Sequence, residues 1–345
     1  MNTKNGSLAA SIIVLLIALA ASMAAGCVLG AADIGIGDVL RVIASKLPIL
    51  GRGIEVAAGT ESIIWHLRLP RVILAALVGG SLAGAGVVFQ AVFRNPMADP
   101  YLLGTSAGAS LGGALAILLG IGFSLPGISG TGVMAFAGSI GAVFLVYGIA
   151  RIRGRVSTAT LLLSGIAVSA FLTAAVSLLL LFYRENMQHV VYWIMGGLGT
   201  ARWDSLPGIV PGMLVALTII GLSSRELNML LLGDETAAHL GVSVDALKRR
   251  MLIVGALLAA LSVSVSGVIG FVGLIVPHMV RLVVGPDHRR LLPTSFLAGA
   301  VFLIIADLLA RSLVPPVEIP VGIVTALFGA PFFLYLLIRR KKGVA

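Results

Sequence analysis

The chain has 345 residues, of which 59% are hydrophobic and 11% are charged, and its formal net charge is +10. Soluble domains carry roughly 25% charged residues, so this composition excludes an ordinary soluble protein. Apolar runs of about 20 residues recur along the whole length. They predict an all-α, polytopic membrane protein.

Ten transmembrane helices are expected. In chain order they cover about 8–30, 63–92, 100–120, 131–150, 156–183, 205–222, 249–269, 272–285, 291–312 and 320–338. The eighth is short, because a bilayer core takes roughly 20 helical residues. Residues 1–345 are expected to form one transmembrane domain, with an outer loop over 31–62, a polar loop over 223–250 and a basic tail over 339–345.

The Lys and Arg residues divide unevenly between the two sides that ten spans define. Of the 24, 16 fall on the side of the N-terminus, and eight fall on the other, namely Arg41, Lys46, Arg52, Arg68, Arg71, Arg184, Arg202 and Arg311. The positive-inside rule therefore places both termini and residues 223–250 in the cytoplasm. Because the basic surplus follows from topology, nucleic acid is not expected as a partner.

The loop over 223–250 is richer in helix signals than any other internal polar stretch. Asp234 is expected to cap a short helix, and Gly241 to end it in a left-handed turn. Ser243 is expected to cap a second helix. Two small helices outside the membrane offer a surface for another protein, so we expect this loop to receive force from a partner.

Small residues crowd the predicted spans. Gly104, Gly108 and Gly112 recur at four-residue spacing, which places them on one face of a helix. Such a face favours close helix packing, with a hinge as the alternative.

Aromatic residues gather in the predicted outer segment 184–207. Tyr192, Trp193 and Trp203 lie there. They are typical of the aromatic belt at a membrane interface. The alternative is a more specific role, in which they line a vestibule for the substrate.

Enzyme motifs are absent from the sequence. It has no GxxxxGK[ST] phosphate loop, no HExxH and no GxSxG, and a single cysteine, Cys27, excludes an intrachain disulfide. Asp307 and Arg311 stand four residues apart, where they favour a structural ion pair. No other acid is evident within the spans, which counts against a proton-driven transporter.

Nine short motifs together carry a strong family resemblance. They cover 67–71, 84–90, 94–100, 103–109, 193–199, 270–281, 287–289, 318–322 and 329–333. The set resembles the FecCD-type permeases, which are membrane subunits of type II ABC importers for iron-siderophores, haem and vitamin B12. The resemblance runs from about residue 60 to residue 338.

The resemblance implies a ten-helix subunit that works as a dimer with a second copy or a close homologue. Two ATP-binding subunits and a periplasmic or lipid-anchored substrate-binding protein would be its partners in the cell membrane of a bacterium or archaeon. The chain itself is then not an enzyme and needs no cofactor or metal, because ATP and Mg would bind the partner ATPase.

The resemblance also assigns site residues. The ATPase-coupling residues are Leu232, Gly233, Asp234, Glu235, Ala238, His239, Leu240 and Gly241. The binding-protein docking residues are Arg68, Arg71 and Arg311, and the alternative is that Arg68 and Arg71 are interfacial anchors. The cytoplasmic gate residues are Asn95, Met97, Ser157 and Thr158, and here the alternative is a helix cap, since Ser157 and Asp99 precede predicted helices.

The function expected from the sequence is therefore an importer permease that translocates an iron chelate, either a siderophore or haem. Vitamin B12 is the alternative cargo. An ion-coupled secondary transporter and a membrane scaffold without transport are the remote alternatives.

Overall fold

The computed structural model describes residues 2–30, 32, 34–47, 55–125, 127–152 and 155–342. Residues 48–54 of the predicted outer loop and 343–345 of the predicted basic tail lie outside them. Most of the described chain is helical, and its strands form two short antiparallel hairpins, β1 (Ser124–Leu125) with β2 (Ile128–Ser129) and β3 (Arg151–Ile152) with β4 (Arg155–Val156).

Ten apolar helices correspond to the ten predicted spans. They are α1 (Asn2–Val28), α4 (Leu69–Val92), α5 (Thr105–Leu118), α6 (Gly130–Ala150), α7 (Thr158–Phe182), α9 (Ser205–Leu222), α12 (Val244–Ser266), α13 (Val272–Val284), α14 (His288–Ser312) and α15 (Val321–Lys342). Among the described residues, seven apolar helical segments are long enough to cross a membrane, and α5, α13 and the apolar part of α15 are shorter.

Short helices fill the connections. They are α2 (Ile36–Ser45), α3 (Ala58–Glu61), the π-helix η1 (Ser62–Arg68), η2 (Pro100–Leu103), η3 (Arg184–Asn186), α8 (Met187–Ile194), α10 (Ser224–Leu230) and α11 (Asp234–His239). Because η1 continues directly into α4, the second span is a single helical segment from Ala58 to Val92.

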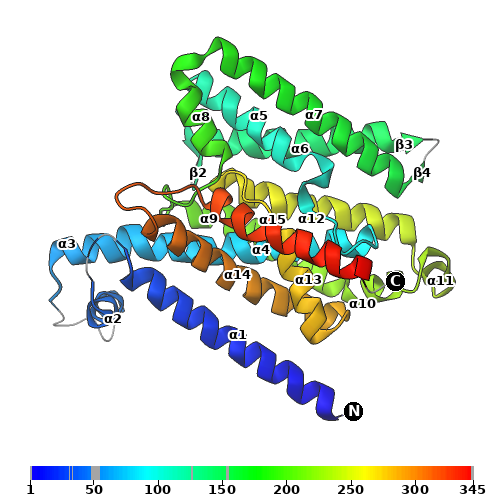
Figure 1. Cartoon of the computed structure of the whole chain (residues 1–345), viewed down its shortest axis with the longest axis horizontal. Helices are drawn as coiled ribbons and strands as arrows, with labels where there is room; N and C mark the ends of the chain where they lie inside the picture. Colours follow the sequence, from blue (N-terminus) through cyan, green and yellow to red (C-terminus); the bar gives the residue numbers. More distant parts are fainter. Residues whose placement is uncertain are drawn as a thin grey trace.

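The long helices run between two opposite ends of the molecule (Figure 1). The start of α1, the end of α15, the β3–β4 hairpin, α10 and α11 lie at one end, which we call the terminal end. The helices α2, α3 and α8 and hairpin strand β2 lie at the other, which we call the outer end. This arrangement agrees with the predicted grouping of both termini with residues 223–250.

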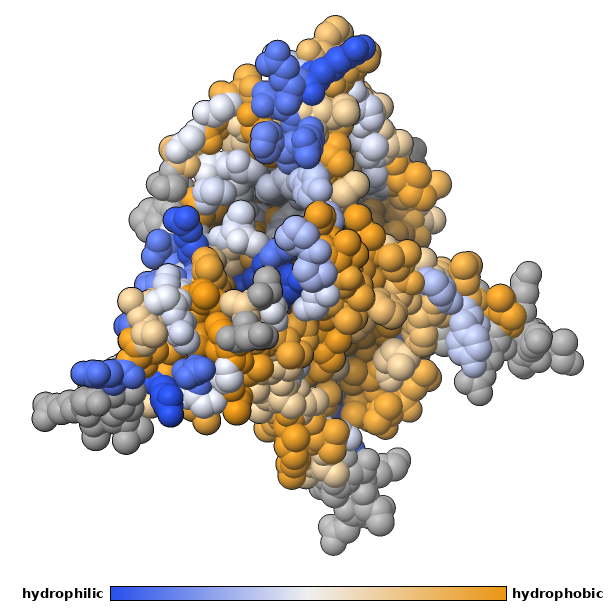
Figure 2. All heavy atoms as spheres, turned by 60° about the vertical axis from the view of Figure 1, so that its left-hand side comes forward, coloured by the Kyte–Doolittle hydropathy of each residue, from blue (hydrophilic) through white to orange (hydrophobic). Residues whose placement is uncertain are grey.

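The centre of the bundle is α4. In the most apolar 18-residue stretch of the span that contains α4, 83% of the residues are buried inside the protein, against 6% for α1 and 22% for α7. The helices α1 and α7 therefore present apolar side chains to lipid. With the outer end turned toward the viewer, Figure 2 shows hydrophilic residues gathered on that end and hydrophobic residues covering the right-hand flank.

Glycines allow α4 to touch its neighbours backbone to backbone. A Cβ added at Gly79 would lie 2.2 Å from the carbonyl oxygen of Gly299 in α14, and one at Gly86 would lie 1.8 Å from that of Gly273 in α13. No side chain fits at these distances, which fixes how closely the three helices pack.

The predicted glycine face of the third span is present in part. Gly108 and Gly112 face α6, where a Cβ would lie 2.3 Å from the carbonyl oxygen of Gly138 and 2.0 Å from that of Met134, respectively. Gly104 lies before the helix, because it has φ 76° and separates η2 from α5. A Cβ there would lie 3.4 Å from Ser169 Oγ of α7 and 3.7 Å from Ala142 of α6. The span therefore begins at Thr105 and not near residue 100.

Candidate functional site

Residues 223–250 extend the bundle at the terminal end. The helix α11 ends in a Schellman motif, in which Gly241 at φ 87° donates to Ala238 O and the Val242 N–H donates to Ala237 O, both at 3.0 Å. The prediction of a left-handed Gly241 is confirmed.

Four details of this loop differ from the prediction. The N-cap of α11 is Gly233, at φ 110°, so Asp234 is the first helical residue and its carboxylate pairs with Lys248 instead. Ser243 stands at the N-cap of α12 but makes no side-chain cap hydrogen bond. The second predicted small helix is the start of α12, which continues into the membrane, and α10 precedes α11 as an unpredicted helix.

Apolar side chains are exposed on this polar segment. Leu232 is 63% exposed and Leu240 is 54% exposed, at the two ends of α11. Glu235, Ala238 and His239 are exposed between them. These five predicted coupling residues therefore form one accessible surface, whereas Gly233 and Asp234 are only partly exposed. An exposed apolar patch on a polar segment marks a contact site for a protein.

Asn228 of α10 joins this segment to the start of α14. Its Nδ2 donates to Asp287 Oδ1 at 2.6 Å, and its Oδ1 accepts from the backbone N–H of His288 at 2.8 Å. Asn228 cannot be recognised as a functional residue from the sequence, since nothing local distinguishes it from a solvated polar residue.

Asp287 also caps α14, because its Oδ1 accepts from the Arg289 N–H at 3.1 Å. Burial acts to raise the pKa of Asp287, but the hydrogen bonds from Asn228 and the Arg289 N–H, together with the charges of Arg290 and Arg289, outweigh it. The pKa of this carboxyl therefore lies below its usual value, and the ionised form is the one that binds Asn228.

The predicted gate residues lie at the terminal end, in the turn after α4 and at the start of α7. Asn95 Oδ1 accepts from the Met97 N–H at 3.0 Å in the turn after α4. Ser157 Oγ accepts from the Thr160 N–H at 3.1 Å and so caps α7, whose first residue is Thr158. The helix-cap alternative is therefore present at Ser157.

Asp99 caps η2 and not the third span directly. Its Oδ1 accepts from the Tyr101 N–H at 2.7 Å. Desolvation by burial raises the pKa of Asp99 to about 6, although the Tyr101 hydrogen bond opposes the shift.

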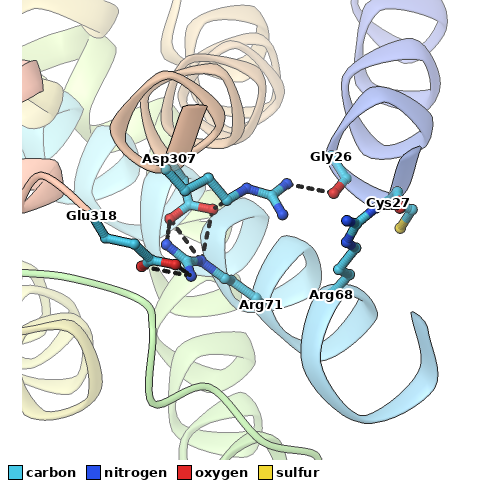
Figure 3. A network of polar contacts seen from close by, with 7 residues as sticks. Gly26, Cys27, Arg68, Arg71, Asp307 and Glu318 are labelled. Atoms are coloured by element: carbon cyan, nitrogen blue, oxygen red, sulfur yellow. Dashed lines mark hydrogen bonds and ion pairs between the residues drawn. The ribbon is translucent and has the colours of Figure 1, made fainter. Parts of the chain in front are cut away.

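At the outer end, Arg71 is the centre of a polar network (Figure 3). Its Nε lies 3.0 Å from both carboxylate oxygens of Asp307, and its Nη1 lies 3.0–3.1 Å from both oxygens of Glu318. The Asp307 side chain is 2% exposed and that of Glu318 is 53% exposed. The predicted Asp307–Arg311 pair is present at 3.8 Å, but Arg71 is the closer partner of Asp307.

Two other arginines bind the end of α1. Arg68 donates to the carbonyl oxygens of Cys27 at 2.8 Å and Val28 at 2.7 Å, and Arg311 donates to that of Gly26. Cations at a helix C-terminus satisfy carbonyls that have no partner within the helix and oppose the helix dipole. Both side chains are largely buried.

The three predicted docking arginines thus lie together. They line one pocket of about 340 Å³ with Glu318 and residues of the 313–320 segment. Arg71 and Arg311 pair with the carboxylates of Asp307 and Glu318, whereas Arg68 binds carbonyl oxygens, so the three arginines carry one positive charge more than the two acids.

The aromatic residues of segment 184–207 do not form one group. Trp203 packs on Trp65, with ring centroids 5.0 Å apart, and its Nε1 donates to the Trp65 carbonyl oxygen at 2.7 Å. Trp193 instead covers Gly113 of α5. Tyr192 is half exposed.

Known proteins match almost the whole chain. The FecCD transport family matches residues 12–339. The cobalamin import system permease protein of Halobacterium salinarum is 49% identical over 81% of this chain and 74% of its own length. The hemin transport system permease protein of Yersinia pestis is 44% identical over 82% and 86%, respectively.

A solved structure shares the fold. It is described as a metal-chelate type ABC transporter in an inward-facing conformation, and it is 32% identical, with a TM-score of 0.81, over 96% of this chain and 99% of that one. The chain belongs to the FecCD transport family.

Proposed function

We propose that this chain is the membrane-spanning permease subunit of an ATP-binding-cassette importer, driven by a separate ATPase. The observation that carries the proposal is the surface of α11 at the terminal end, where Leu232 and Leu240 are exposed outside the apolar part of the bundle. A groove on an ATPase subunit would bury these leucines. ATP and Mg would bind that partner and not this chain.

The complex would contain a second permease copy or a close homologue. The helix α7 supports this arrangement, because small residues including Ala167, Ala170 and Ala174 are exposed along it although it lies in the membrane-spanning bundle. Two such faces would form a translocation path between copies, with α15 beside it. The gate residues Asn95, Met97, Ser157 and Thr158 would close that path at the terminal end, in the cytoplasm.

A substrate-binding protein would dock on the outer end, above Arg68, Arg71 and Arg311. The surplus positive charge there suits an acidic partner surface, and complementary charge guides the orientation and rate of docking. Asp307 and Glu318 would hold Arg71 and Arg311 in place for that contact, and the carbonyl oxygens at the end of α1 would hold Arg68.

The cargo is a metal chelate, and the iron chelates, siderophore or haem, are the expected class. The hemin permease relative, 44% identical, supports this class. Cobalamin is the second candidate, because the cobalamin permease relative is 49% identical. The ligand that co-purifies with the partner binding protein, identified by mass spectrometry, decides between them.

Reconstitution tests the function directly. The chain is co-purified with its ATPase in lipid vesicles and supplied with loaded binding protein. We expect ATP hydrolysis to rise and the chelate to accumulate only when ATP is present. Unchanged hydrolysis, or uptake driven by an ion gradient without the ATPase, would exclude an ABC importer.

The coupling surface has a matched test. Ala238 is exposed on α11, so Ala238→Glu is expected to leave the fold intact and to abolish ATP-driven uptake by blocking contact with the ATPase. Ala246→Glu places the same charge on an exposed position of α12 outside α11 and should transport normally. Normal uptake by both variants would remove the coupling assignment.

A further inference from the structure

The helix α14 is bound by polar side chains of other elements near both of its ends. At the terminal end, Asn228 of α10 contacts the Asp287 carboxylate and the His288 N–H. At the outer end, Arg71 of α4 binds both oxygens of Asp307. Asp287 and Asp307 are 20 residues apart, which is about 30 Å along a helix.

Between these contacts α14 runs as one helix from His288 to Ser312, and Pro293 near its start leaves one backbone hydrogen bond of the helix unmade. It passes α4 at the Gly79–Gly299 crossing, where the backbones touch. At this crossing Leu303 of α14 packs on Gly79 and Phe296 packs on Gly80, so α14 and α4 are in close contact there. A displacement at one end therefore reaches the other end of α14.

We propose that Asn228 is a positioning residue that transmits movement of the 223–250 segment to α14, and that α14 carries this movement as a rigid body to the arginine network at the outer end. The inference rests on the proposed function, in which an ATPase moves the first site and a binding protein docks on the second. Nucleotide binding on one side then changes the affinity for the binding protein on the other, and the effect is reciprocal.

The contact between Arg71 and the exposed Glu318 would change when α14 moves. Arg71 binds both Asp307, which moves with α14, and Glu318, which belongs to the 313–320 segment before α15. A shift of Asp307 changes the position of the Arg71 guanidinium and hence its contact with Glu318. The charge that faces a docking partner changes with it.

A swap of donor and acceptor tests the role of Asn228. Asn228→Asp places a second carboxylate against Asp287, which turns the 2.6 Å hydrogen bond into a repulsion. Asp287→Asn, added to Asn228→Asp, restores a donor and an acceptor at the same place and keeps a residue type suited to the N-cap. Asp245→Asn, at an exposed position of α12, is the control for loss of a carboxylate at the same end.

The first measurement is the affinity of the reconstituted complex for its binding protein, with and without a non-hydrolysable ATP analogue. We expect the analogue to change the affinity of the wild-type complex at least roughly fivefold, within the usual range of allosteric coupling. The change should fall below about twofold in Asn228→Asp and return in the double variant. A merely structural role for Asn228 would lower the amount of complex but leave the response of the assembled fraction unchanged, and that result would overturn the inference.

The second measurement follows α14 itself. The only cysteine, Cys27, is replaced by Ser, and Leu313→Cys, at a 58% exposed site just after α14, carries a spin label. The distance between labels on the two copies should change on addition of the analogue in the wild-type background and in the double variant, but not in Asn228→Asp. A constant distance in a complex whose ATP hydrolysis responds to the binding protein would overturn the role of α14 and leave the proposed function standing. If ATP hydrolysis does not respond to the binding protein either, the role of α14 and the proposed function are both excluded.

Discussion

At the scale of single residues, the Arg71 network at the outer end contains one buried acid and one exposed acid. Asp307 and Glu318 both bind Arg71, but their side chains are 2% and 53% exposed. A buried guanidinium that loses its partner keeps the cost of its own desolvation, whereas water replaces an exposed partner.

We therefore expect Asp307→Asn to lower the free energy of unfolding by about 3 kcal/mol, because Arg71 and Arg311 keep their charges in a buried site. Glu318→Gln is the matched control and should cost at most about 1 kcal/mol. Thermal unfolding of the detergent-solubilised chain measures both. Equal losses would contradict the assignment of Asp307 as the main partner of Arg71.

Asp99 predicts a pH dependence. The fold raises its pKa to about 6, whereas an unfolded Asp carboxyl titrates near pH ~4. The folded chain thus binds the proton of the Asp99 carboxyl more tightly than the unfolded chain does. The contribution of this proton to the free energy of unfolding is therefore complete below about pH 4 and is lost as the pH rises through about 6. Asp99→Asn keeps the cap acceptor without the charge.

The stability of Asp99→Asn relative to the wild type should therefore rise between about pH 4 and pH 7 and stay level outside that window. Denaturation midpoints across the pH range measure it, with Asp245→Asn as an exposed control. A difference that does not vary with pH would show that Asp99 titrates normally.

At the scale of helices, the glycine crossings decide which elements are neighbours. Gly86→Ala would bring a Cβ within 1.8 Å of the Gly273 carbonyl oxygen, so we expect a loss of about 3 kcal/mol or a failure to fold. Gly141→Ala in α6 meets nothing within 4 Å and should stabilise its helix by about 0.5–1 kcal/mol. Thermal unfolding of the two alanine variants distinguishes them, and similar midpoints would contradict the close α4–α13 approach.

Hydrophobic runs predict the long helices well, because each span is apolar over most of its length. The start of α5 was placed too early, since the apolar residues before Gly104 form the separate helix η2. The sequence predicts the N-cap of α11 one residue late, at Asp234. The N-cap is Gly233, which has a positive φ and makes no side-chain cap hydrogen bond. At such turns several sequence signals favour different residues as the start of the helix. In both cases the backbone conformation of a glycine determines where the helix begins.

At the scale of the whole molecule, the sequence does not reveal which distant residues pair. Arg71 and Asp307 are 236 positions apart and Asn228 and Asp287 are 59 apart, and no spacing rule joins them. Their contacts follow from the packing of α4, α10 and α14. The family resemblance implies site roles for Arg71 and Arg311, and the four-residue spacing predicts Asp307 as a partner of Arg311 but not of Arg71.

The assembly has a measurable size. Two copies of a 35.4 kDa chain contribute about 71 kDa to the proposed complex. Native mass spectrometry of the complex with its ATPase should therefore find two permease chains with two ATPase subunits. A complex with a single permease chain would contradict the proposed translocation path between copies.

The arginines at the end of α1 have a consequence for biosynthesis. The first helix leaves the ribosome early, but its carbonyl groups at Gly26 and Cys27 await guanidinium groups that are encoded 285 and 41 residues later. At about 10 residues per second, Arg311 arrives roughly half a minute after Gly26. During that interval α1 has little of its surface against protein, and Arg68 of the second span is the first arginine to bind its outer end. The contact of Arg311 with Gly26 forms only when the ninth span is inserted.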